Sequence, residues 1–170
     1  VDLIAGTSHS DLPLEWHEND GTGTFTSHAI TTGIANVRDL VANDVDEDGD
    51  VDFIAASENA GTMWFENDGN GSFTRHGIGV STSTSSLDVA DVDADGDLDI
   101  VGGGGNAPVI WYENDGNENF FERELPLTVD GTVDAGDVLD VAAVDIDNDG
   151  FTDIVTTDRG ADQVAWYQND

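Results

Sequence analysis

Cysteine, lysine and long apolar runs are all missing from this 170-residue sequence. Without cysteine, no disulfide holds the fold, and cysteine usage carries no information about the redox compartment. No segment approaches the roughly 20 consecutive apolar residues of a membrane-spanning helix, so we expect no membrane insertion. Four arginines face 37 aspartates and glutamates, and the formal net charge is −33. Such a surface repels phosphate, which excludes nucleic acids and anionic membranes as partners.

A nine-residue acidic motif occurs three times, as DVDEDGDVD (44–52), DVDADGDLD (91–99) and DIDNDGFTD (145–153). Each copy follows D-x-D-x-D-G-x-x-D, which gathers carboxylates that cannot all stay ionised around one point without a cation. Oxygen ligands in an irregular arrangement favour calcium. A single acidic run could equally be a solvated loop, but three copies with the same glycine and spacing favour a metal site. Adaptation to a salty medium remains the alternative explanation of the overall charge.

The positions of the motif have different expected roles. Position 6 is glycine in every copy, which permits a positive φ where the loop folds back. Position 7 is Asp50, Asp97 or Phe151, and phenylalanine has no ligating side chain, so we expect the backbone carbonyl to bind there. The motif resembles the first half of an EF-hand loop. It ends instead with aspartate at position 9 and continues into an apolar run typical of a buried strand.

The sequence repeats with a period near 47 residues. Trp16, Trp64, Trp111 and Trp166 open the phrases WHENDG, WFENDG, WYENDG and WYQND, at intervals of 48, 47 and 55 residues. This period, with four short strands in each unit, is typical of a β-propeller blade. In the second unit we expect strands at 38–42 and 52–56, on either side of the aspartate loop. Two more are expected at 63–66 and 73–78, joined by an Asn-Asp-Gly hairpin turn.

The predicted fold is an all-β propeller of four-stranded antiparallel blades, in one domain covering residues 1–170, with repeats at about 1–36, 37–86, 87–136 and 137–170. Asp2 aligns with position 9 of a further loop, and Asn169-Asp170 aligns with Asn67-Asp68. By this alignment two blades are complete, the first partial blade lacks its first strand and the last lacks its fourth. Open strand edges invite pairing. We therefore expect head-to-tail contact between identical units, along a longer chain or between subunits.

The motif and its period resemble the FG-GAP/VCBS repeat family, and the W-[FY]-E-N-D-G phrase is similar to bacterial secreted VCBS-repeat proteins. The resemblance implies an integrin-like β-propeller with calcium between the first and second strands of each blade, about three ions here. Such sites fill at the millimolar calcium found outside cells, which implies extracellular placement. Phe151 departs from the pattern, so we expect the third site to be weaker. By position, the implied ligands are Asp44, Asp46, Asp48, Asp50 and Asp52; Asp91, Asp93, Asp95, Asp97 and Asp99; and Asp145, Asp147, Asp149, Phe151 and Asp153.

Other conspicuous residues have ordinary structural interpretations. His28 and His76 occupy equivalent places in the expected fourth strand, with Glu124 there in the third repeat, so we expect a structural and not a catalytic role. The recurring Trp–Phe/Tyr pairs either pack between blades, which is the commoner use, or stack on sugar rings. The run from Gly102 to Gly105 is expected to be a flexible turn between the second and third strands.

Two functions fit these features. The first is a non-catalytic, calcium-binding extracellular repeat module for adhesion, carbohydrate binding or structural assembly, with glycans or cell-surface proteins as partners. Near-identical repeats favour it, because an active site normally breaks the symmetry of repeats. The second is part of a secreted carbohydrate-active enzyme of the lyase or dehydratase type. Its active site would use the longest departure from the repeat, Pro126 to Gly136.

Overall fold

The structure is a computed structural model that describes residues 2–6, 14–31, 34–79, 84–105, 107–125, 137–160 and 162–169. These residues form four antiparallel β-sheets of three or four strands. Within these ranges there is no helix, and so none long and apolar enough to span a membrane. The predicted all-β fold with antiparallel sheets is confirmed.

Each sheet is built from strands that follow one another in the chain. The first sheet holds β1 (Leu3–Ala5), β2 (Leu14–Asn19) and β3 (Phe25–Thr31). The second holds β4 (Val37–Asn43), β5 (Asp52–Ser57), β6 (Gly61–Asn67) and β7 (Phe73–Gly79). The third holds β8 (Ser86–Ala90), β9 (Asp99–Gly104), β10 (Ala107–Asn114) and β11 (Phe120–Glu124). The fourth holds β12 (Val138–Val144), β13 (Asp153–Asp158) and β14 (Gln163–Tyr167).

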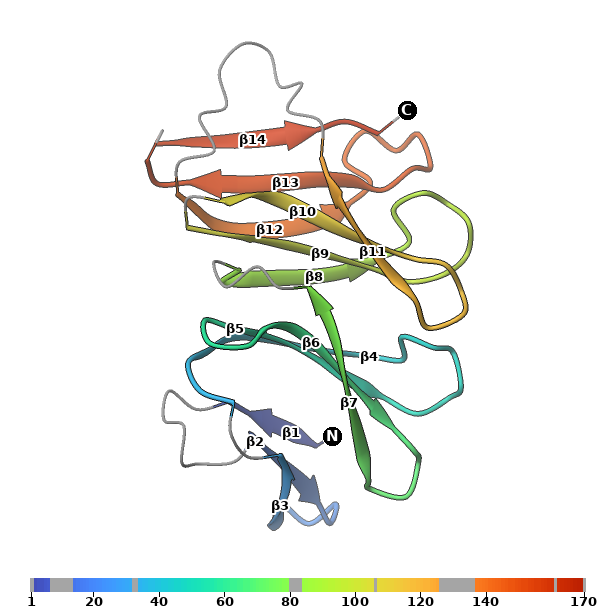
Figure 1. Cartoon of the computed structure of the whole chain (residues 1–170). Helices are drawn as coiled ribbons and strands as arrows, with labels where there is room; N and C mark the ends of the chain where they lie inside the picture. Colours follow the sequence, from blue (N-terminus) through green and yellow to red (C-terminus); the bar gives the residue numbers. More distant parts are fainter. Residues whose placement is uncertain are drawn as a thin grey trace.

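The four sheets lie one after another, with the first and last at opposite ends of an open row (Figure 1). The connections β4–β5, β8–β9 and β12–β13 all emerge on the same side of the row, at the right of Figure 1. These connections carry the three aspartate motifs. The fold therefore presents the three acidic loops along one side of the molecule.

The hydrophobic core lies between successive sheets. Side chains alternate along a strand, so Trp64 and Phe65 in β6 point to opposite faces of the second sheet. Trp64 packs in a cluster with Leu87 and Tyr112 of the third sheet, while Phe65 packs in a cluster with Leu14 of the first. Both aromatic side chains are almost fully buried. At these two positions the aromatic pair packs between sheets, which was the commoner of its two expected uses.

Polar contacts also join the first strands of neighbouring sheets. The carboxylate of Asp39 in β4 accepts a hydrogen bond from the backbone N–H of Leu87 in β8, at 2.7 Å. At the next interface the hydroxyl of Ser86 in β8 accepts from the backbone N–H of Val141 in β12, at 3.2 Å. Asp39 and Ser86 both stand five residues before their aspartate loops. The residue five positions before the loop therefore links its sheet to the next one at two interfaces, through an aspartate at the first and a serine at the second.

The glycine run differs from its predicted role as a flexible turn. Gly102, Gly103 and Gly104 lie in β9 and are buried. A Cβ at Gly103 would stand 2.5 Å from Cγ1 of Val141 and 2.8 Å from Cγ1 of Val138, in the neighbouring sheet. Glycine at position 103 is therefore required by close packing between the third and fourth sheets. Sequence reasoning assigned the run to a turn because glycine is common in turns and the packing partners of Gly103 lie over 30 residues away.

Replacing Gly103 tests this close approach. We expect Gly103→Val to lower the free energy of unfolding by about 1–3 kcal/mol, because the added methyl groups must push the third and fourth sheets apart. Gly77→Val is the matched control, since Gly77 also lies in a strand but a Cβ there meets nothing within 4 Å. Chemical denaturation of the two variants measures the difference. Equal stabilities would show that the third and fourth sheets are not closely packed at this point.

Candidate metal centres

Two residues with positive φ shape each acidic loop. At position 6, Gly49, Gly96 and Gly150 have φ of 99°, 102° and 98°, which confirms the positive φ predicted there. At position 4, Glu47, Ala94 and Asn148 have φ of 60°, 61° and 63°. Sequence reasoning missed this second left-handed position. Asparagine at position 148 was the available signal, because asparagine adopts this conformation more readily than most residues.

The loops bring carboxylates of each motif close together. In each of three groups, one carboxylate oxygen per residue lies within 4.8 Å of the others. All three groups contain positions 1 and 3; the first adds position 5, and the other two add position 9. The members are Asp44, Asp46 and Asp48; Asp91, Asp93 and Asp99; and Asp145, Asp147 and Asp153.

In the first two loops, the aspartate at position 1 has one oxygen held by the loop and one oxygen without a hydrogen bond, whereas both oxygens of Asp145 in the third loop accept backbone N–H groups. The backbone N–H of Gly49 donates to Oδ2 of Asp44 at 3.0 Å, and that of Gly96 donates to Oδ2 of Asp91 at 3.1 Å. The Oδ1 atoms of Asp44 and Asp91 are buried and have no hydrogen-bond partner among the described residues. A buried carboxylate oxygen without a donor is costly. A cation held by each cluster would give the Oδ1 atom in that cluster a partner, so the residues present fit a bound metal ion.

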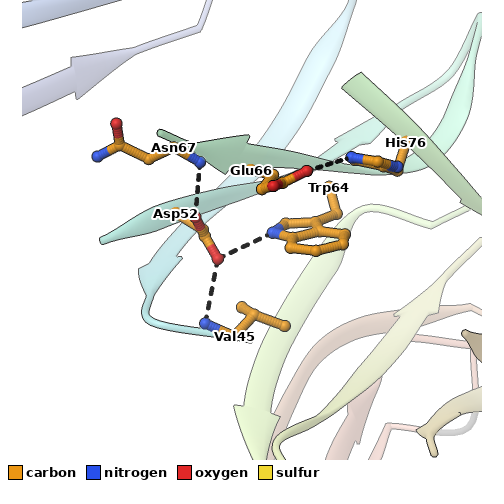
Figure 2. Close-up of polar contacts among 6 residues, drawn as sticks. All are labelled: Val45, Asp52, Trp64, Glu66, Asn67 and His76. Atoms are coloured by element: carbon orange, nitrogen blue, oxygen red, sulfur yellow. Dashed lines mark hydrogen bonds and ion pairs between the residues drawn. The ribbon is translucent and has the colours of Figure 1, made fainter. Parts of the chain in front are cut away.

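The aspartate at position 9 is fully buried and ties its loop to the sheet (Figure 2). Oδ2 of Asp52 accepts from the backbone N–H of Val45 at 3.2 Å and from Nε1 of Trp64 at 3.0 Å. Oδ1 accepts from the backbone N–H of Asn67 at 2.8 Å. One carboxylate thus joins the start of the loop, the start of β5 and the end of β6.

This arrangement recurs in the other repeats. Asp99 accepts from the N–H groups of Val92 and Asn114 at 3.0 and 2.8 Å. Asp153 accepts from those of Ile146 and Asn169 at 3.0 and 2.9 Å. Asp2 likewise accepts from Asn19 N–H at 3.0 Å. Sequence reasoning identified the candidate metal ligands but missed these supporting residues. Their signal was the recurrence of the W-x-x-N spacing after each aspartate motif.

At position 7 the side chains point elsewhere. The carboxylates of Asp50 and Asp97 lie against Gly69 and Gly116, in the Asn-Asp-Gly turn of the same repeat, where any side chain would collide with them. Neither carboxylate belongs to a cluster. The backbone carbonyl at position 7 stays the predicted ligand there.

Electrostatics differ among the three loops. Burial raises the pKa of Asp52 above its ordinary value, although the hydrogen bonds that this carboxylate accepts partly oppose the effect. Burial raises the pKa of Asp99 to about 6. Burial and the neighbouring carboxylates also raise the pKa of Asp46 and of Asp93. For Asp153 desolvation is outweighed by hydrogen bonds, chiefly from the Asn169 and Ile146 N–H groups, and its pKa lies below the ordinary value.

The third loop also differs in a neighbour of position 3. Nε2 of Gln168 donates to Oδ2 of Asp147 at 2.9 Å. The equivalent residues in the second and third repeats are glutamates, Glu66 and Glu113, whose charges raise the pKa of Asp46 and of Asp93. The last loop therefore has an amide where the others have a carboxylate. Because Gln168 and Phe151 are both uncharged, the third loop has less negative charge around it than the first and second loops.

The histidines are paired with glutamates and stacked on tryptophans. His76 stacks on Trp64 with ring centroids 4.7 Å apart, and its Nε2 lies 2.8 Å from Oε2 of Glu66 (Figure 2). His28 stacks on Trp16 in the same way. These contacts join β2 to β3 in the first sheet and β6 to β7 in the second, in keeping with the structural role expected for the two histidines.

The third-repeat equivalent of these histidines was assigned wrongly. The strand register pairs Trp111 with Arg123 and not with Glu124. Nε of Arg123 donates to Oε2 of Glu113 at 2.7 Å. His28, His76 and Arg123 are therefore the equivalent residues, and each lies next to a glutamate on the neighbouring strand. The predicted equivalent, Glu124, is one residue beyond the correct position.

Acidification should stabilise the calcium-free chain. With the pKa of Asp99 raised from 3.8 to about 6, the folded state binds more protons than the unfolded state between these values. The stabilisation is complete below the unfolded pKa and is lost as pH rises through the folded pKa. Asp46, Asp52 and Asp93 act in the same direction. In excess chelator we expect a higher Tm at about pH 5 than at about pH 7.

Differential scanning calorimetry at the two pH values makes this measurement. A calcium-saturated sample is the control, because protons there compete with the ion and the advantage of low pH should vanish or reverse. A chelated sample that is more stable at the higher pH would contradict the raised pKa values.

Comparison with known proteins relates the three aspartate loops to a family of repeats. Residues 44–102 and 91–156 each match the family model of the FG-GAP-like repeat. No curated protein sequence matches the chain. Among solved structures, a lectin of Agrocybe aegerita that recognises non-reducing terminal N-acetylglucosamine is similar, with a TM-score of 0.60 at 22% identity. The match covers 92% of this chain and 46% of the lectin, so this chain spans about half the lectin's length.

The likeness to the lectin is a likeness of fold. The family matches say more, because together they extend from residue 44 to residue 156 and contain all three aspartate motifs. They cover more than half of the chain, and the family expected from the motif and its period is confirmed. The protein belongs to the FG-GAP-like repeat family.

Proposed function

We propose that this chain is a calcium-binding repeat module of an extracellular, non-catalytic protein, with its sheets arranged as blades of a β-propeller. The observation that carries the proposal is the pair of buried, unpartnered oxygens, Oδ1 of Asp44 and Oδ1 of Asp91, in equivalent carboxylate clusters. The open row of sheets, each packed face to face on the next, supports the propeller arrangement.

The chemistry of the donors favours calcium among the common metals. Every member of the three clusters is a carboxylate, and neither histidine nor cysteine contributes. Hard oxygen donors in an irregular loop suit calcium, whereas zinc and copper favour nitrogen or sulfur. When bound, the ion supplies positive charge that relieves the repulsion within each cluster. The chain's own residues hold each loop in shape. The backbone N–H at position 6 donates to the carboxylate at position 1, and the buried carboxylate at position 9 accepts from the backbone N–H at position 2.

Multi-aspartate loops of this kind suit the millimolar calcium outside cells, which supports extracellular placement. Each of the two three-stranded sheets has an exposed apolar residue on an edge strand at an end of the row, Leu3 in β1 and Val164 in β14. These edges support contact with a neighbouring unit of the same kind, in a longer chain or a second subunit.

Carbohydrate binding is the ligand class that this proposal favours. A hollow of about 340 Å³ between the third and fourth sheets is lined by Trp111, Arg123 and Tyr167, together with Asp93 and Gln168. Aromatic faces next to polar side chains suit a sugar ring. The likeness of fold to a lectin adds support. The segment considered for the enzymatic alternative, Pro126 to Gly136, lies outside the described residues, and no other observation favours catalysis.

Calcium should raise the stability of the protein strongly. Three sites filled at about 100 times their Kd would add about 8 kcal/mol, and each kcal/mol moves Tm by about 2–4 °C in a chain of this size. We therefore expect Tm to rise by more than about 15 °C between chelator and excess calcium. Magnesium at the same concentration is the control. Equal melting temperatures in chelator and calcium would disprove the metal site.

Two neighbouring substitutions distinguish a side-chain ligand from a backbone one. We expect Asp48→Ala to weaken calcium binding by more than the roughly 10-fold typical of losing a supporting residue, because its carboxylate belongs to the cluster. Asp50→Ala should change it much less, since its carboxylate lies against Gly69 and its backbone carbonyl remains. Isothermal titration calorimetry measures both. Equal losses would contradict the assignment of position 7.

A glycan array, read with calcium and with chelator, tests the ligand class. We expect calcium-dependent binding that Trp111→Ala abolishes and that Val164→Ala, a substitution at an exposed site outside the hollow, leaves intact. A turnover assay on acidic polysaccharides should be negative. Turnover would instead establish the enzymatic alternative.

A further inference from the structure

Two asparagine side chains reach from one sheet to the acidic loop of the sheet before it. Nδ2 of Asn114, at the end of β10, donates to the carbonyl of Val45 at 3.4 Å. Nδ2 of Asn169, just after β14, donates to the carbonyl of Val92 at 2.7 Å. Val45 and Val92 both occupy position 2 of their aspartate motifs. The same contact therefore occurs at two successive interfaces, between residues 69 and 77 positions apart in the sequence.

The same asparagines also hold the acidic loop of their own repeat. The backbone N–H of Asn114 donates to Oδ1 of Asp99, and that of Asn169 donates to Oδ1 of Asp153. Each asparagine thus touches two loops, one through its side chain and one through its backbone. Asn114 is almost fully buried, so its side-chain amide is shielded from solvent.

Position 2 continues this path within each loop. The backbone N–H of Val45 donates to Asp52 while its carbonyl accepts from Asn114. Val92 does the same between Asp99 and Asn169. The side chains of both valines are buried in the clusters between sheets. A continuous series of hydrogen bonds therefore runs from Asp52 through Asp99 to Asp153.

We propose that Asn114 and Asn169 are positioning residues that couple the three metal loops, so that calcium bound in one loop strengthens binding in the next. The proposal rests on the calcium-binding function proposed above. It adds that the three sites do not fill independently.

The coupling arises because each loop has an ordered and a less ordered state. Without an ion, the clustered carboxylates repel one another and oppose the ordered state. An ion in the first loop fixes Val45, whose carbonyl then holds the amide of Asn114. With its amide fixed, Asn114 presents its backbone N–H to Asp99, so the second loop loses less conformational freedom when its own ion binds. Coupling of this kind is reciprocal, because both sites bias the same ordering.

The chain contains a matched control for the side-chain contact. Asn67 is the equivalent residue of the second repeat, and its backbone N–H donates to Asp52 as those of Asn114 and Asn169 do to their aspartates. Its Nδ2 donates to the carbonyl of Val51 in its own repeat. Asn114 makes that local bond as well, to Leu98. Among the described residues, Asn67 lacks only the contact with a preceding loop.

Glycine amides offer one signal for each loop. The N–H groups of Gly49, Gly96 and Gly150 each donate to the position 1 carboxylate of their own motif, at 3.0, 3.1 and 3.1 Å. Their ¹⁵N–¹H NMR signals should therefore move when the corresponding loop binds calcium. Following all three through a calcium titration gives the midpoint of each site separately.

We expect Asp48→Ala, which removes a side-chain oxygen from the first cluster, to raise the calcium concentration at which the Gly96 signal shifts by roughly 5-fold or more. When Asn114 is also replaced by alanine, Asp48→Ala should cause no further change in the Gly96 midpoint. When Asn67 is replaced by alanine instead, the effect of Asp48→Ala on the Gly96 midpoint should persist. Asn169→Ala should likewise separate the Gly150 signal from changes in the second loop.

The outcomes separate this proposal from the one it rests on. If no glycine signal responds to calcium in the unaltered chain, the calcium function itself fails. If all three respond but Asp48→Ala leaves the Gly96 midpoint unchanged, the sites are independent and the coupling is disproved. Loss of coupling in the Asn67→Ala background would assign the effect to general loosening of the turn. Melting curves in excess calcium identify any variant that fails to fold, and Asn114→Ser then replaces Asn114→Ala.

Discussion

The buried aspartate at position 9 of each motif is the constraint on which the rest of the structure depends. Asp52, Asp99 and Asp153 have no exposed surface, yet each is a carboxylate in a strongly acidic chain. Burial of such a group is tolerated only because backbone N–H groups from the loop and from the third strand converge on it. The same hydrogen bonds set where the loop begins and where the third strand ends. The acidic loop and the antiparallel sheet are therefore one structural unit.

This unit places the repulsive charge on one side of the molecule and the apolar contacts between the sheets. The three loops emerge together from the row of sheets. The apolar side chains of alternate strand positions fill the clusters between neighbouring sheets. A dication in each loop would offset repulsion where the carboxylates are closest. The hydrophobic clusters contain none of the clustered carboxylates, so we expect the ion to regulate loop order and overall stability more than the pairing of strands.

The repeats are alike in plan but differ in detail. His28, His76 and Arg123 all sit beside a glutamate on the neighbouring strand, although the side chains are of two types. Asp39 and Ser86 both accept a backbone N–H of the next sheet. In the last repeat, Phe151 and Gln168 replace residues that are acidic in the two preceding repeats. These differences leave the hydrogen-bonding plan intact and change the charge around each loop, so the three sites should differ in affinity while sharing one architecture.

The sequence by itself determined the features that depend on neighbouring residues. The D-x-D-x-D-G-x-x-D spacing, the glycine at position 6 and the apolar run after position 9 were enough to predict acidic loops leading into buried strands. The repeat period near 47 residues and the Asn-Asp-Gly turns predicted antiparallel sheets. The chemistry of the side chains was enough to predict oxygen-rich clusters, because the motif is short and its geometry is local.

Only the tertiary structure decided the contacts between sheets. It placed Gly102 to Gly104 in a buried strand, where Val138 and Val141 of the next sheet leave no room for a side chain at Gly103. Likewise it paired Arg123 with Trp111, since strand register is set by both strands together. It also brought Asn114 onto the carbonyl of Val45, 69 residues earlier. Such contacts join residues far apart in the chain and depend on how whole sheets pack, which no local spacing encodes.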